Sequence, residues 1–175
     1  MPDLPQFKYN PEALAHGILK KEITTCPVCE LTRDFVYEGP FFAVEDVEGI
    51  CPWCIADGSA AKKYEGVFID EASSEEIADG YKVEELTQRT PSYTGWQQEQ
   101  WLSHCDDYCA FKGYVGWKEI ASIKEELEDD LDRIMDDFDL SEKELKENLV
   151  NHSGMQGYLF QCLHCGQHRL HVDLE

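Results

Sequence analysis

Basic residues are scarce in this chain. Lysine and arginine together number 15, against 36 aspartate and glutamate residues, which gives a formal net charge of −21. A nucleic-acid-binding protein needs a basic face for the phosphates, and an anionic membrane attracts the same kind of face. The composition therefore argues against both ligands, and it favours either a basic protein partner or a purely solubilising role for the charge.

Long apolar stretches are also missing. The chain contains no run of about 18 apolar residues, so no transmembrane helix is expected. Residues 1–10 lack the basic region and the apolar region of a secretory signal. We therefore expect a cytoplasmic protein, in which thiols stay reduced.

The chain is well supplied with aromatic side chains and with closely paired cysteines. Four tryptophans, eight tyrosines and eight phenylalanines supply enough apolar surface for a folded core despite the acidity. In a reducing compartment, closely paired cysteines are more often metal ligands or redox centres than structural disulfides. All eight cysteines fall into such pairs: Cys26/Cys29, Cys51/Cys54, Cys105/Cys109 and Cys162/Cys165.

The first two cysteine pairs predict a zinc site. Each forms a Cys-Pro-x-Cys turn, which aims both of its sulfurs at one point. Strand-like segments at residues 34–37 and 41–44 lie between the turns, a pattern typical of a zinc ribbon. The expected ligands are Cys26, Cys29, Cys51 and Cys54.

Two alternatives remain for these cysteines. The Cys51-Pro52-Trp53-Cys54 motif is also compatible with a thiol–disulfide redox centre or another enzyme, since proline is common inside redox Cys-x-x-Cys motifs. The sequence shows no βαβ unit of the kind that surrounds such a centre. The cysteines could also pack merely as small apolar groups.

The last two cysteine pairs predict a second zinc site, for a total of two Zn²⁺ per chain. Cys105 and Cys109 are four residues apart and would share one face of a helix. The knuckle from Cys162 to Cys165 is followed by Gly166, which permits a tight turn beneath a metal. The expected ligands are Cys105, Cys109, Cys162 and Cys165. Four histidines are alternative ligands if a cysteine lies elsewhere: His104, His164, His168 and His171.

A long acidic amphipathic helix pair is expected over Lys118 to Val150. Apolar residues recur there at intervals of three and four, and a capping box at Ser141–Glu144 starts the second helix. Carboxylates crowd the opposite face, where they would either meet a basic protein or simply be solvated. The residues expected to contact a partner are Glu125, Glu128, Asp129, Asp132 and Asp136.

These elements predict an α+β fold of zinc-ribbon-like β-hairpin units, stapled by zinc sites of four cysteines each, together with the helix pair. We expect an N-terminal zinc-ribbon-like unit at residues 1–70. A helical region with the second zinc knuckle follows at 71–175. The alternative is that both form one compact domain.

The motifs resemble those of the CbrC family of bacterial proteins over nearly the whole chain. The matching segments are Phe7–Pro11, Cys26/Cys29, Cys51–Ala60, Thr90–Pro91, Gly95–Glu99, Trp101, His104–Cys105, Cys109, Gly116–Trp117 and Phe160–Gly166. The family name is associated with tolerance to a nuclease colicin. That association implies no known reaction, and it fits an acidic protein that meets a basic toxin. Together with the cysteine pairs, it leads us to expect a zinc-binding, acidic interaction protein that confers tolerance to a nuclease toxin by binding a basic partner.

Overall fold

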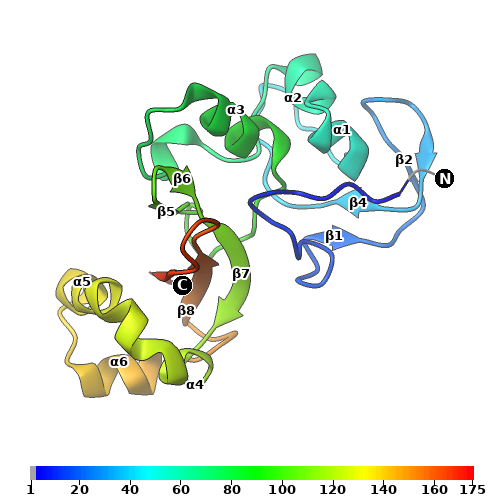
Figure 1. Ribbon diagram of the computed structural model, residues 1–175. Coiled ribbons are helices and arrows are strands. Elements are labelled where there is room, and N and C mark those ends of the chain that lie inside the picture. The colour runs from blue at the N-terminus through cyan, green and yellow to red at the C-terminus, as the bar shows by residue number, and fades with distance from the viewer. Residues whose placement is uncertain (1–2) are drawn as a thin grey trace. The chain divides into compact units, whose positions relative to one another are not determined.

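Runs of short strands and runs of short helices follow one another along the chain, and the strand pairs are antiparallel, which confirms the α+β class (Figure 1). The computed structural model describes residues 3–175, and contacts within the chain divide it into two units, Met1–Thr94 and Gly95–Glu175. The division falls later than residue 70, because α3 packs on α1 and α2 and so belongs to the first unit. Within residues 3–175, every helix is too short or too polar to cross a bilayer.

The first unit consists of two small antiparallel strand pairs followed by helices. Its elements are β1 (Leu19–Lys20), β2 (Thr24–Thr25), β3 (Thr32–Arg33), β4 (Val36–Tyr37), α1 (Pro52–Ala56), α2 (Ser59–Tyr64), the 3₁₀ helix η1 (Glu71–Ser73) and α3 (Gly80–Arg89). Strand β1 pairs with β4, and β2 pairs with β3. The β2–β3 hairpin carries the first cysteine turn at its tip.

The expected zinc-ribbon topology is not what this unit forms. Segments 34–37 and 41–44 do not pair with each other: β4 pairs with β1, and Phe42 bridges Val67. The chain turns away after β4 because the Tyr37 hydroxyl donates to the carbonyl of Pro40, and Phe41 then packs on Phe68 with ring centroids 4.7 Å apart. The second cysteine turn opens helix α1 instead of a second hairpin.

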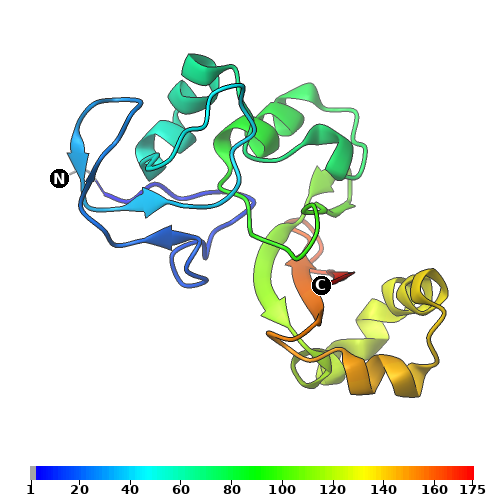
Figure 2. The ribbon, with the colours of Figure 1, turned by 180° about the vertical axis from the view of Figure 1, so that it is seen from behind.

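The second unit is built on a three-stranded antiparallel sheet in the order β7-β8-β9. Its elements are β5 (Ser103–His104), β6 (Asp107–Tyr108), β7 (Ala110–Val115), α4 (Trp117–Ile120), the 3₁₀ helix η2 (Ala121–Leu127), α5 (Glu128–Phe138), α6 (Glu142–Asn148), β8 (Met155–Gln161) and β9 (His168–Leu174). Strands β8 and β9 pair from Met155↔Leu174 to Gln161↔His168 and form a hairpin with the Cys162 knuckle at its tip. Figure 2 shows the ribbon from behind, where α6 follows α5 after a short loop.

The apolar stripe of the acidic segment forms the core of the second unit. Ile120, Leu127 and Ile134 are all buried against the sheet, together with Leu145 and Leu149 of the second helix. The capping box is present, since the Ser141 and Glu144 side chains bond each other's backbone N–H groups.

The prediction of a single long first helix is wrong, because this segment is divided into α4, η2 and α5. Tertiary contacts account for the tighter middle segment. The side chain of Gln167 donates to the carbonyl oxygen of Glu126, which is thereby satisfied from outside the helix.

Candidate metal centres

The first candidate centre, site 1, lies where the β2–β3 hairpin meets the start of α1. One potential ligand atom from each of four cysteines falls within 4.8 Å of the others: Cys26, Cys29, Cys51 and Cys54. The Sγ atoms of Cys26 and Cys54 are 3.9 Å apart, and those of Cys29 and Cys51 are also 3.9 Å apart. Each of these two sulfur pairs joins one cysteine of the first turn to one cysteine of the second. All four sulfurs therefore form a single cluster.

Local backbone structure explains this convergence. In the first turn, Glu30 takes a positive φ of 59°, and its N–H donates to the carbonyl of Cys26 at 2.8 Å. In the second turn, Cys51 is the N-cap of α1, and Pro52 occupies the first helical position, where a missing N–H costs nothing. The N–H of Cys51 also points at the Cys26 sulfur, 3.4 Å away.

The sulfur spacing fits a tetrahedral metal rather than a disulfide. A disulfide requires an S–S distance of about 2.05 Å, which is far shorter than either pair. A tetrahedron with Zn–S bonds of about 2.3 Å has S···S edges of about 3.8 Å. The measured 3.9 Å separations therefore match the edges of a zinc–thiolate tetrahedron.

The electrostatics of site 1 already favour a thiolate. The hydrogen bond with Cys51 lowers the pKa of the Cys26 thiol to about 4, although burial acts in the opposite direction. The same hydrogen bond raises the pKa of Cys51, and burial raises it further. Arg33 lies near the cluster, since a hydrogen bond to Cys29 raises the pKa of its guanidinium. Its guanidinium carbon stands 4.8 Å from the centre of the Trp53 ring.

The redox alternative for Cys51 and Cys54 has a specific difficulty here. A redox Cys-x-x-Cys pair needs its two sulfurs free to bond each other, and in this arrangement each sulfur has a close neighbour in the first turn. Like a redox motif, the pair does open a helix, but α1 spans only Pro52–Ala56 and follows no parallel strand among the described residues.

The second candidate centre, site 2, lies between the β5–β6 turn and the β8–β9 knuckle. Its four donors also fall within 4.8 Å of one another: His104, Cys105, Cys162 and Cys165. The Sγ atoms of Cys105 and Cys165 are 3.8 Å apart, and Nδ1 of His104 lies 3.2 Å and 3.3 Å from them. Three cysteines with one histidine is a usual structural zinc set, whose N···S edges are about 3.5 Å long.

The expected ligand Cys109 lies outside this group, and His104 takes its place. Cys109 is fully buried; its N–H donates to Leu102, and its carbonyl accepts from the Trp101 indole at 3.0 Å. The helix that was expected to bring its sulfur beside that of Cys105 does not form. Residues 103–108 form a β-hairpin in which Cys105 and Asp106 are the two turn residues, each with a φ of 55°.

Two positive φ angles in succession identify a type I′ turn. The usual sequence sign of such a turn is Asn-Gly or Asp-Gly, and Cys105-Asp106 does not carry it. His104 could have been predicted as a donor from its position directly before Cys105, because adjacent donors at a tight turn can reach one metal.

The knuckle of site 2 has the expected geometry. Gly166 adopts a φ of 79°, and its N–H donates to the carbonyl of Cys162 at 3.1 Å. The Cys162 sulfur accepts from the N–H of His164 at 3.4 Å. Burial raises the pKa of the Cys162 thiol, but the N–H groups of Cys165 and His164 outweigh it and bring the pKa down to about 6.

The remaining histidines have other partners. His164 pairs with the buried carboxylate of Asp107 at 2.9 Å, and His168 pairs with Glu126 at 2.8 Å. The ring of His171 stacks on Tyr158, and burial lowers its pKa to about 4. Within residues 3–175, His104 is the one histidine that belongs to a group of potential metal ligands.

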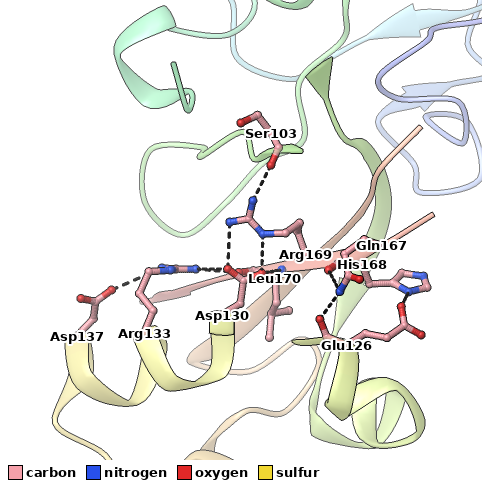
Figure 3. A network of polar contacts seen from close by, with 9 residues as sticks. All are labelled: Ser103, Glu126, Asp130, Arg133, Asp137, Gln167, His168, Arg169 and Leu170. Atoms are coloured by element: carbon pink, nitrogen blue, oxygen red, sulfur yellow. Dashed lines mark hydrogen bonds and ion pairs between the residues drawn. The ribbon is translucent and has the colours of Figure 1, made fainter. Parts of the chain in front are cut away.

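An ion-pair network centred on the buried carboxylate of Asp130 supports the loop that carries His104 and Cys105 of site 2 (Figure 3). Arg169 of β9 donates to both carboxylate oxygens of Asp130, at 2.9 Å and 3.1 Å, and it also donates to the carbonyl of Ser103. Ser103 directly precedes the potential ligand His104. Asp130 further accepts from Arg133 at 3.2 Å and from the N–H of Leu170 at 2.8 Å. The network thus ties α5, β9 and the ligand loop together.

The five carboxylates expected to contact a partner all lie exposed on η2 and α5: Glu125, Glu128, Asp129, Asp132 and Asp136. Their side chains make no hydrogen bond or ion pair within the described chain, whereas Glu126, Asp130 and Asp137 each do. Glu125, Glu128 and Asp132 line one groove beside α6, and Asp129 and Asp136 lie outside it.

Comparison with known proteins identifies the family. Proteins of UPF0167 from Mycobacterium bovis and Mycobacterium tuberculosis are each 39% identical to this chain over 176 residues, covering 97% of it and 93% of the relative. One from Pseudomonas aeruginosa is 39% identical over 180 residues, covering 99% of the chain and 98% of the relative. No solved structure matches significantly. Residues 4–174 match the profile of the family itself, so the chain belongs to the uncharacterised protein family UPF0167.

Proposed function

We propose that this protein binds two zinc ions as structural cross-links and acts as an interaction protein rather than as an enzyme. The observation that supports the metal is the spacing of the donors. Sulfur pairs 3.8–3.9 Å apart in both clusters match the edges of a zinc–thiolate tetrahedron. Thiolate-rich sets of this kind select zinc over the hard cations magnesium and calcium.

A structural role for the metal follows from the donor count. Each cluster offers four protein donors, which fill a tetrahedral site and leave no position for water or substrate. Zinc, when bound, supplies a cross-link without redox chemistry. The cysteines of site 1 would then hold the β2–β3 hairpin to the start of α1. The donors of site 2 would hold the β8–β9 hairpin to the β5–β6 turn.

The proposed partner is a basic protein met in the cytoplasm. The net charge of −21 and the unpaired carboxylates of α5 support it, because complementary charge accelerates and orients association. The resemblance to the CbrC family, with its association with tolerance to a nuclease colicin, adds a nuclease-type toxin as a candidate partner.

Metal analysis together with thiol counting tests the proposal. Protein purified under reducing conditions should contain two zinc ions per chain, because each cluster supplies one four-donor set. After chelation and denaturation under nitrogen, all eight cysteines should react with a thiol reagent. Protein with no metal and with Cys51 and Cys54 joined as a disulfide would refute the zinc proposal and support the redox alternative.

A further inference from the structure

The acidic helices of the second unit enclose a groove with an apolar floor. It measures about 340 Å³ and runs between η2, α5 and the helices α4 and α6. In the ribbon, η2 joins α4 to α5, and α6 follows α5 after a short loop (Figures 1 and 2). Apolar side chains in the lining come from Trp117, Leu131, Met135 and Leu145. A space of this size admits one or two large side chains of a partner.

Carboxylates form the rim of this groove. Three of them, Glu125, Glu128 and Asp132, make no ion pair or hydrogen bond with any described residue, and the cation Lys124 is the one basic residue in the lining. The spacing of Glu128 and Asp132 places like charges one helical turn apart, which destabilises a helix. A cation brought between them would relieve this repulsion.

The protein's own lysine illustrates how such a cation binds. The ammonium of Lys146 lies 5.0 Å from the centre of the Trp117 ring and 2.6 Å from the carboxylate of Glu142. Trp117 and Glu142 both line the groove. An aromatic face beside a carboxylate is therefore already in use here as a receptor for a lysine side chain.

Charge decides between the possible occupants. A second copy of this chain would bring another net charge of −21, and an anionic membrane would be repelled as well. A segment that fits must carry cations along its edges and bulky apolar side chains on one face, which describes a basic amphipathic helix. We propose that this groove, lined by Glu125, Glu128, Asp132 and Met135, binds a basic amphipathic helix of a partner protein.

This inference rests on the proposed role as an interaction protein and names the class of segment recognised. The test uses the full, metal-loaded chain and a labelled model peptide of about 14 residues, in which leucines occupy one helical face and lysines the other. Fluorescence anisotropy at low salt should show saturable binding. Oligolysine with the same number of lysines should bind at least about tenfold more weakly, since it has nothing to place on the apolar floor.

Two charge-matched double variants locate the binding. The variant Glu128→Gln/Asp132→Asn removes two rim carboxylates and should weaken peptide binding about fivefold. The control Asp129→Asn/Asp136→Asn removes the same charge from the same helix outside the groove, and it should bind like the wild type. Met135→Ala removes apolar surface from the groove. It should weaken binding of the Leu/Lys peptide and leave binding of oligolysine unchanged.

Three results would overturn the inference. They are absence of saturable peptide binding, equal weakening by the two double variants, and equal affinity for oligolysine and the amphipathic peptide. Metal content is measured on every variant, and all should keep the wild-type zinc content. A loss of groove binding with zinc intact is thereby distinguishable from a failure of the zinc proposal.

Discussion

Arg169 and Asp130 form a two-bond fork, with Nε donating to Oδ2 at 2.9 Å and Nη2 donating to Oδ1 at 3.1 Å. The same guanidinium donates to the carbonyl of Ser103, the residue before the potential ligand His104. The planar guanidinium meets the carboxylate and the carbonyl at once, which a lysine ammonium cannot do in the same geometry. The fork therefore connects the helical layer to the ligand loop of site 2.

Removing the Asp130 charge should destabilise the second unit. Asp130 is almost fully buried, and Asp130→Asn would leave Arg169 without its charged partner, a change that costs about 3 kcal/mol for a buried pair. Urea denaturation of the metal-loaded protein measures the loss. The neighbouring variant Asp129→Asn, at an exposed position, should be neutral within about 0.5 kcal/mol. Equal stability of the two variants would contradict a structural role for the fork.

The same carboxylate predicts sensitivity to acid. Burial alone would raise the pKa of Asp130, but Arg169 and the Leu170 N–H outweigh it and hold the pKa below its ordinary value. An aspartate titrates near pH 3.9 in an unfolded chain, so this contribution is complete above about pH 4. It is lost as the pH falls through the lower folded-state pKa. Below pH 4, the stability of the wild type should therefore fall more steeply with acid than that of Asp130→Asn.

Single substitutions should separate the two metal sites. Cys51→Ser should remove the zinc of site 1, and Cys162→Ser should remove the zinc of site 2, because each deletes one of four donors. His104→Ala should act like Cys162→Ser. The matched control is Cys109→Ala, which replaces a buried cysteine outside both groups and should retain two zinc ions. If Cys109→Ala loses a metal while His104→Ala keeps it, the ligand assignment of site 2 is wrong.

The turn of the β5–β6 hairpin gives a test at a single backbone position. Asp106 has a φ of 55°, which glycine adopts freely and β-branched residues avoid. We expect Asp106→Val to lower thermal stability, by about 1–2 kcal/mol, and to weaken metal binding at site 2. Asp106→Gly should lose less of both than Asp106→Val, although it removes the same carboxylate. A thermal melt with and without a chelator distinguishes the two variants, and equal losses would point to the carboxylate instead.

Solvent access should set the order in which metal is lost. Cys105 and Cys165 of site 2 are exposed, whereas three cysteines of site 1 are buried and the fourth is half-buried. A chelator in excess should therefore remove the metal of site 2 first. Following release from the wild type and from Cys162→Ser assigns the phases, because only the fast phase should disappear in the variant. Disappearance of the slow phase would reverse the order.

The elements that were predictable from sequence are those whose signal is local. The four cysteines of site 1 could be grouped from sequence because each Cys-Pro-x-Cys turn brings its own sulfurs together. The β8–β9 hairpin and the Ser141–Glu144 capping box follow from similarly short patterns.

The elements that were missed depend on contacts between distant segments. His104 lies in the second cysteine group in place of the predicted Cys109 because Cys105 and Asp106 form a turn with positive φ angles. Neither residue type is a usual sequence signal for such a turn. The division of the long helix involves Gln167, which lies 41 positions away from Glu126 and bonds its carbonyl. The pairing of β4 with β1 likewise depends on a distant contact, the packing of Phe41 on Phe68.

The positions of the ligands along the chain also impose an order on assembly during synthesis. The potential donors of site 1 are complete once Cys54 has left the ribosome, so the proposed zinc cross-link of the first unit can form while the rest is still being made. Site 2 requires Cys105 and Cys165, which are 60 positions apart. Until Cys165 emerges, the thiol of Cys105 and the imidazole of His104 lie on an exposed turn without the other two donors of the site. The nascent second unit is thus the stage at which the protein is most open to oxidation or to capture of a wrong metal.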